Sequence, residues 1–172
     1  DTTNRLLNPT LLGGMSSEAE GKIASVANPH GVTAEGGFIY ATGYNLGKIG
    51  VVQKDGAALK ENTSAAVDLK RDIQQYAGYT FTETYQNHDT GQTHTGDPNA
   101  AQVHGEALLT NGRNLYAAVS VNPNGGYNSY DDGFLMQYDI QDDGSLKFGS
   151  YTRISRNIDQ GRLNKFNDQI LV

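Results

Sequence analysis

Two histidine-glycine dipeptides, His30-Gly31 and His104-Gly105, are the first candidates for chemistry in this chain. Each dipeptide opens a segment that runs through a glycine-containing turn into a strand-like sequence, FIYAT after the first and LYAAV after the second. If the segments are equivalent units, His30, His104 and Gln160, which has the corresponding place in a third unit, face one ligand. In the structural alternative, each imidazole binds the backbone of a neighbouring unit, and each glycine allows a close approach.

A second candidate set lies in the polar loop from Asn87 to Asp97. His88, Asp89, His94 and Asp97 combine two imidazoles with two carboxylates, which are ligand types for divalent metals. Their spacing matches no standard zinc motif, so a solvent-exposed polar loop is the alternative to a metal site. No other cofactor is indicated.

The tract NPNGGYNSYDD, residues 122–132, lengthens the connection between two expected strands. Its tyrosines lie among Asn, Asp and Gly, a composition typical of surfaces that stack on rigid partners or sugars. We therefore expect Tyr127, Tyr130 and Asp131 to form a loop that binds a protein partner or a glycan. A plain flexible loop is the alternative.

Two familiar motifs are excluded by inspection. The segment from Asp139 to Gly144 resembles the start of an EF-hand loop, but Ser150 stands where the twelfth position requires Glu. The chain also has no Gly-x-Ser-x-Gly nucleophile motif. We therefore expect no catalytic residues, and the sequence favours a protein that is not an enzyme.

Composition narrows the classes of partner. The formal net charge is −6, from 13 basic and 19 acidic residues, and Lys70-Arg71 is the longest basic run, so nucleic acid is an unsuitable partner. Apolar windows are far shorter than the roughly 20 residues of a membrane span. There is no cysteine, and Gly (21) and Tyr (10) are abundant. This composition favours an extracellular or cell-surface bacterial protein whose signal segment has been removed.

The repeat predicts an all-β fold of four-stranded antiparallel units. In each unit an apolar strand leads to a turn at Asp55-Gly56 or Asp143-Gly144, and the next strand restarts at Leu59-Lys60 or Leu146-Lys147. The expected parts are an outer strand of a preceding unit at 20–28, unit 1 at 29–61, an insertion at 62–102, unit 2 at 103–157, and the start of unit 3 at 158–172.

The insertion has two interpretations. Ala66, Leu69, Ile73 and Tyr76 have helical spacing and are followed by Gly78, which predicts a short amphipathic helix after a cap at 62–64. Alternatively, residues 64–69 form the fourth strand of unit 1. The remainder of the insertion is expected to be a long polar excursion.

The order PHG, FIYAT, Asp-Gly and Leu-Lys resembles the repeat of lactonase-like seven-bladed β-propellers, also called YVTN-repeat proteins. The resemblance covers 22–59 and 103–172. This chain departs from it by having FIYAT and LYAAV in place of the family's Tyr-Val-Thr-Asn. The resemblance implies blades whose first strand is innermost and whose His-Gly end lies near a central channel. It also implies lactone hydrolysis at that channel as an alternative function.

Known propellers close with about four to eight blades, whereas this chain has two full units and parts of two others. A lone pair of blades would expose apolar faces. We therefore expect a partial propeller that serves as a structural or binding scaffold. It would be a fragment of a longer propeller, a processed chain associated with its other half, or a subunit of a homo-oligomer.

Overall fold

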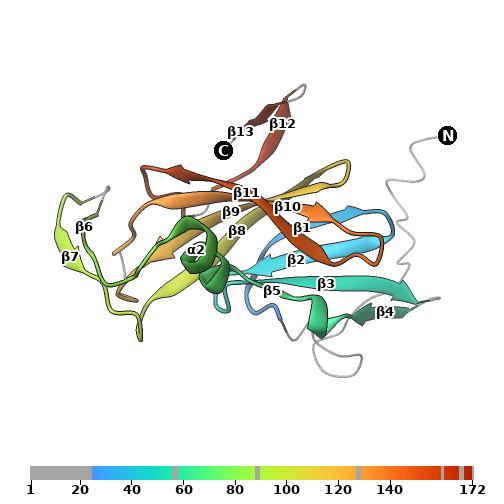
Figure 1. Ribbon diagram of the computed structural model, residues 1–172, viewed down its shortest axis with the longest axis horizontal. Helices are drawn as coiled ribbons and strands as arrows, with labels where there is room; N and C mark the ends of the chain where they lie inside the picture. Colours follow the sequence, from blue (N-terminus) through green and yellow to red (C-terminus); the bar gives the residue numbers. More distant parts are fainter. Residues whose placement is uncertain are drawn as a thin grey trace, which may run out of the picture.

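The computed structural model describes residues 25–55, 58–87, 90–126, 129–159, 161–166 and 169–171. These residues form mainly antiparallel strands and one α-helix, which confirms the all-β expectation (Figure 1). No helix among them has the length and apolar character needed to cross a lipid bilayer.

The first sheet comprises the predicted unit 1. Its strands are β1 (Pro29–Glu35), β2 (Phe38–Gly43), β3 (Lys48–Asp55) and β4 (Ala58–Glu61), with the short β5 (Val67–Asp68) also paired to β3. The strands follow one another in sequence order, as in the predicted meander. Ala58–Glu61 is the fourth strand, and of residues 64–69, which the alternative assigned to this role, only Val67–Asp68 form a strand, paired with the other end of β3.

The second sheet comprises the predicted unit 2, in the same meander order. Its strands are β8 (Gln102–Asn111), β9 (Asn114–Asn122), β10 (Gly133–Ile140) and β11 (Leu146–Ile154). The alternation of side chains along β11 is interrupted by a β-bulge, where Ser150 pairs with Gln137 but Phe148 pairs with Tyr138. Phe148 therefore lies on the same face as Tyr151, and not on the face of Ser150 and Thr152.

The insertion contains the predicted helix, although it begins later than the sequence suggested. The 3-10 turn η1 (Thr63–Ala65) precedes α2 (Leu69–Ala77), and β6 (Thr84–Gln86) and β7 (Thr93–Thr95) form a small hairpin after it. The Asp68 carboxylate caps the helix by accepting from the Arg71 amide, and Gly78 ends it in the left-handed conformation. Leu69 and Ile73 anchor it in the core.

The ends of the described chain bear on two further expectations. The segment expected to begin a third unit contains the hairpin of β12 (Asn164–Phe166) and β13 (Gln169–Leu171), whose turn lies outside the described residues. That it begins a further unit stays a prediction. Most of the outer strand expected at 20–28 also lies outside them. The described part of that segment, 25–28, is a turn and not a strand.

The two larger sheets pack face to face, with β1 beside β8 (Figure 1). We call the face of the first sheet that contacts the second its front; it carries Tyr40, Ile49 and Val51. The contacted face of the second sheet is its back, and its opposite face is its own front. The back supplies the other half of the core, with α2 packed along it: Leu108, Leu115, Ala117, Val119, Val121, Phe134, Met136 and Tyr138.

Candidate functional site

The strand registers change which residues of the two units are equivalent. In β1 the ladder skips from Pro29 to Gly31, and in β8 it skips from Gly105 to Ala107. Both skips occur at the same place in the sheet, because Gly31 pairs with Thr42 and Ala107 with Ala118. His30 and Glu106 are therefore the equivalent bulge residues. The expected equivalence of His30 and His104 is wrong by two residues, since β8 is longer between its His-Gly pair and its turn.

The two bulge residues meet at the junction of the sheets. Glu106 is fully buried, and its Oε1 accepts a hydrogen bond of 2.5 Å from the Ser120 hydroxyl. Its Oε2 lies 3.2 Å from His30 Nδ1. A carboxylate accepts, so the imidazole donates through Nδ1. The His30 side chain is 26% exposed, and the buried carboxylate thus orients a partly exposed imidazole.

Tyr44 lies between the two histidines that the sequence singled out. Its ring stacks on His104, with centroids 3.8 Å apart, and lies 5.2 Å from the ring of His30. The structure therefore does bring His30 and His104 together, around an aromatic ring that sequence reasoning had not identified. Gln160, the third predicted member, lies outside the described residues.

His104 is almost completely buried. Its Nδ1 lies 2.6 Å from the Tyr44 carbonyl oxygen, which can only accept, so the Nδ1 carries the proton. Burial lowers the pKa of His104 from its ordinary value, although the Tyr44 carbonyl and Glu106 oppose that shift. No described residue forms a hydrogen bond with its buried Nε2. The ring is thus held neutral, with an accepting nitrogen directed into the interior.

The two glycines of the repeated dipeptide permit the close approach of the sheets. A Cβ on Gly105 would lie 1.8 Å from Thr42 Oγ1, and one on Gly31 would lie 2.8 Å from the Leu108 amide nitrogen. Both separations are far inside van der Waals contact. The structural alternative proposed for the His-Gly pairs thus agrees with the contacts of the glycines.

The loop at 122–132 differs from the exposed partner-binding loop that the sequence indicates. Tyr130 and Asp131 are buried, at 5% and 6% exposed. The Tyr130 hydroxyl bonds to that of Tyr44, and Asp131 accepts from the Tyr79 hydroxyl at 2.6 Å. These bonds tie the loop to the insertion and to the histidine cluster, because the tyrosines bury their rings and satisfy their hydroxyls internally. Tyr127 lies outside the described residues.

The predicted metal ligands can be followed only in part. His94 packs against the Tyr85 ring across the β6–β7 hairpin. Asp97 is exposed and its carboxylate accepts from the Asn99 amide, closing a turn. His88 and Asp89 lie outside the described residues. Within the described ranges, no group of three His, Asp or Glu side chains is arranged to hold a metal ion.

A cavity of about 580 Å³ lies on the front of the second sheet. Its walls come from β10, β11, the following loop and β13. They are Leu135, Thr152, Ile154, Arg156, Asn157, Ile158, Asp159, Gly161 and Ile170. The lining is largely apolar, and a small apolar cluster of Ala107, Ala118 and Ile158 adjoins it.

Sequence reasoning missed Glu106, Tyr44 and Ser120. Glu106 offered a signal, because a carboxylate stands directly before the apolar run Ala107 to Leu109 in a predicted strand. The chemistry available is that of a carboxylate-oriented imidazole. Ser120 donates to the carboxylate and not to an imidazole, so it is not arranged as a nucleophile of the Ser-His type.

No protein family, no curated protein and no solved structure matches this chain.

Proposed function

We propose that this chain is part of an extracellular or cell-surface bacterial β-propeller and acts as a structural or binding scaffold. Further blades, from partner chains or from a longer precursor, would complete the ring. The observation that carries the proposal is the way in which the front of one sheet packs on the back of the next.

Equivalent positions support this stacking. Tyr40 in the first sheet and Tyr116 in the second occupy the same place in their ladders. Ile49 and Leu135 are equivalent in the same way, because Ile49 pairs with Thr42 and Leu135 pairs with Ala118. Tyr40 and Ile49 are fully buried against the second sheet. Tyr116 and Leu135 lie on the front of the second sheet and are only partly buried. The second front therefore repeats the residues of an interface whose other half is incomplete.

Contacts made by the chain after β11 support the proposal that a further blade follows. Ile158 and Leu163 pack against Ala107 and Ala118 on this front. The β12–β13 hairpin follows these residues, with Ile170 lining the cavity. In a ring of blades, each front would be covered in this manner by the unit that follows.

The proposal is tested by native mass spectrometry of the protein purified from its source without denaturation. A particle with additional blades, covalent or associated, is expected. A solitary 172-residue species that melts cooperatively at high dilution and binds no hydrophobic dye would contradict the proposal.

A hydrolase of the lactonase type is the second candidate, and the Glu106–His30 pair favours it. A buried carboxylate that fixes an imidazole through Nδ1 leaves the other nitrogen to take a proton from water. The test is hydrolysis of a lactone panel by the native particle. Activity that is lost in His30→Ala and Glu106→Gln, but kept in the surface variant Tyr151→Ala, would establish this candidate. A particle that hydrolyses none of the lactones would remove it.

A further inference from the structure

We infer that Asn111 is a site of spontaneous deamidation in the folded protein, and that the Lys165 ammonium promotes the reaction. The chain has two Asn-Gly pairs, Asn111-Gly112 and Asn124-Gly125. A glycine after the asparagine favours this reaction, because no side chain hinders the backbone amide that attacks. The two pairs lie in different surroundings, and those surroundings select the first.

Deamidation joins the side chain of an asparagine to the next backbone amide. Hydroxide removes the proton of the Gly112 nitrogen, which attacks Asn111 Cγ and closes a succinimide ring. The bond from Cγ to Nδ2 breaks, and the leaving nitrogen takes a proton from water and departs as ammonia. A further water molecule opens the ring at either carbonyl, which gives aspartate or isoaspartate. The only co-reactant is water, and nothing is oxidised or reduced.

The first pair lies at the two-residue turn between β8 and β9. Asn111 pairs with Asn114 across the ladder. Gly112 and Arg113 therefore form the turn, and Gly112, at its first position, has a φ of 59°, as a type II′ turn requires. Among the described residues, the Gly112 amide donates no backbone hydrogen bond. A Cβ on Gly112 would have no atom beyond its chain neighbours within 4 Å. Hydroxide and water therefore reach this amide.

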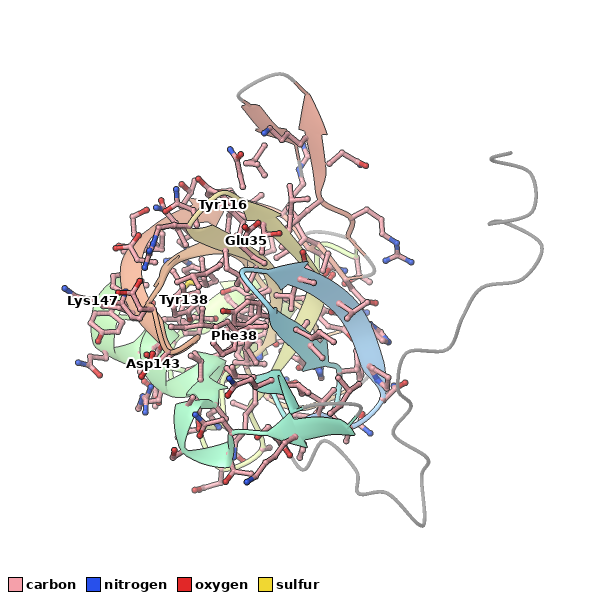
Figure 2. The ribbon with its side chains drawn as sticks, turned by 90° about the vertical axis from the view of Figure 1, so that its right-hand side faces the viewer. Glu35, Phe38, Tyr116, Tyr138, Asp143 and Lys147 are labelled. Carbon is pink, nitrogen blue, oxygen red and sulfur yellow. The ribbon has the colours of Figure 1, made fainter. Side chains whose placement is uncertain are left out.

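Lys165 brings a positive charge to the carbonyl that is attacked. Its Nζ donates to Asn111 Oδ1 at 2.7 Å. Attack at Cγ moves negative charge onto Oδ1, and a nearby ammonium stabilises that charge more than it stabilises the neutral amide. Figure 2 shows Tyr116, which follows this turn on β9, on the side of the molecule from which the β12–β13 hairpin projects. Lys165 reaches the turn from β12 of that hairpin.

The second pair is protected from this reaction. The Gly125 amide donates to the carbonyl three residues before it, at 3.4 Å. Asn124 Oδ1 accepts from the Gly126 amide at 3.0 Å and from the Ser129 hydroxyl, so the carboxamide is fixed. The insertion also covers the turn, because a Cβ on Gly125 would lie 2.4 Å from the Ala100 carbonyl oxygen. Reaction at Asn124 therefore requires this loop to open.

Deamidation would change the contact that promotes it. The new carboxylate at position 111 would form an ion pair with Lys165 in place of the present hydrogen bond. Isoaspartate would also lengthen the backbone of the turn by one methylene group. Because the turn fixes the register of β8 with β9, that product would weaken the ladder near Asn114.

The test follows both asparagines in the same molecule. The 172-residue chain would be incubated in mildly alkaline buffer, folded and in urea, and then digested for peptide mass spectrometry. In urea, Asn111 and Asn124 are expected to deamidate at similar rates, since both precede glycine. In the folded chain, Asn111 is expected to react at least about tenfold faster than Asn124, because the loop around Asn124 must open first.

Lys165→Met tests the role of the ammonium, because it removes the charge and keeps an unbranched side chain. It should slow deamidation of Asn111 in the folded chain about two- to fivefold, as expected for an exposed charge contact. The rate in urea should not change. The matched control is Lys60→Met, which removes the same charge at an exposed position of the first sheet and should leave both rates unchanged.

Equal rates at Asn111 and Asn124 in the folded chain would overturn the inference. So would an Asn111 that reacts in urea but stays intact in the folded chain. A Lys165→Met chain that deamidates at Asn111 as fast as the wild type would overturn the role of Lys165. Equal slowing by Lys60→Met would overturn it as well, because the effect would then come from net charge.

Discussion

The two larger sheets share a meander of four consecutive strands and differ in what covers their fronts. Ile49 in the first sheet and Leu135 in the second occupy the same position in the ladder. Ile49 is fully buried, whereas Leu135 borders a cavity of about 580 Å³. This difference in burial arises from what packs on each front and not from the sheet itself. In a repeat, the burial of a front residue is therefore decided by the unit that follows.

The His-Gly dipeptides show a second contrast between the units. His30 is a bulge residue, is partly exposed and contacts Glu106 in the following unit. His104 lies in the regular ladder, is buried and contacts the backbone of Tyr44 in the preceding unit. The histidine of the same dipeptide therefore contacts the following unit in one case and the preceding unit in the other.

The largest expected effect is the difference in stability cost between truncating a residue on the first front and truncating its equivalent on the second. Ile49→Ala should reduce the free energy of unfolding by about 4 kcal/mol, because it leaves a cavity in a closed core. Leu135→Ala should cost about 1 kcal/mol in the isolated chain, because its side chain already borders open space. Urea unfolding measures both. Equal costs would show that the second front is packed as well as the first, which would remove the contrast.

Gly105→Ala tests the close approach of the sheets and should cost about 3 kcal/mol, through overpacking against Thr42. The matched double variant, Thr42→Ala with Gly105→Ala, should recover part of that loss, because the added methyl gains room. Thermal unfolding of the two single variants and the double variant gives the coupling free energy. Independent, additive effects would contradict the contact.

The two histidines should differ in their contribution to stability. His104→Ala removes a buried, stacked ring and leaves the Tyr44 carbonyl without its donor, which should cost about 2 kcal/mol. His30→Ala removes a partly exposed ring and one donor of the buried Glu106 carboxylate, which keeps the Ser120 hydroxyl as a donor, and it should cost about 1 kcal/mol. Chemical denaturation measures both, with Val32→Ala as a control at an exposed position of the same strand. A larger loss for His30→Ala would reverse the interpretation of the pair.

Much of the strand architecture could be predicted from sequence because its signals are local. Asp143-Gly144 predicted the β10–β11 turn, and Leu146-Lys147 predicted the start of β11. The bulge beside Phe148 was not predictable, since one extra residue in a ladder leaves no local mark. The helix was predicted by the spacing of Leu69 and Ile73, but its start depended on whether Asp68 or an earlier residue acted as the cap.

The site was less predictable because it is assembled across units. The repeated phrase pointed to His30 and His104, and these histidines do lie in one cluster. Their partners, Tyr44 and Glu106, come from a loop of one sheet and a bulge of the other. Tyr130 was expected on the surface since its neighbours are polar. It is buried because its hydroxyl meets that of Tyr44, a contact across 86 residues of sequence.

The smallest expected effect is the pH dependence of the free energy of unfolding. Its sign distinguishes the buried His104 from an exposed histidine. Burial lowers the pKa of His104 below its ordinary 6.5, so the unfolded chain binds a proton at this site at a higher pH than the folded chain does. The free energy of unfolding should therefore rise with pH through this window. The contribution is complete above the unfolded pKa and is lost as pH falls through the folded pKa. Its slope cannot exceed about 1.4 kcal/mol per pH unit for one proton.

The measurement compares the wild-type chain with His104→Gln in urea between about pH 5 and pH 8, a range that spans the ordinary pKa of histidine. Gln can still donate to the Tyr44 carbonyl but does not titrate. The difference between the two stability curves isolates His104 from Glu106 and His30, which face it across the cluster. It should fall as the solution is acidified, because only the wild type must bury an imidazole that water would protonate. A difference that is constant with pH would mean that water reaches the ring, and His104 would then resemble His30.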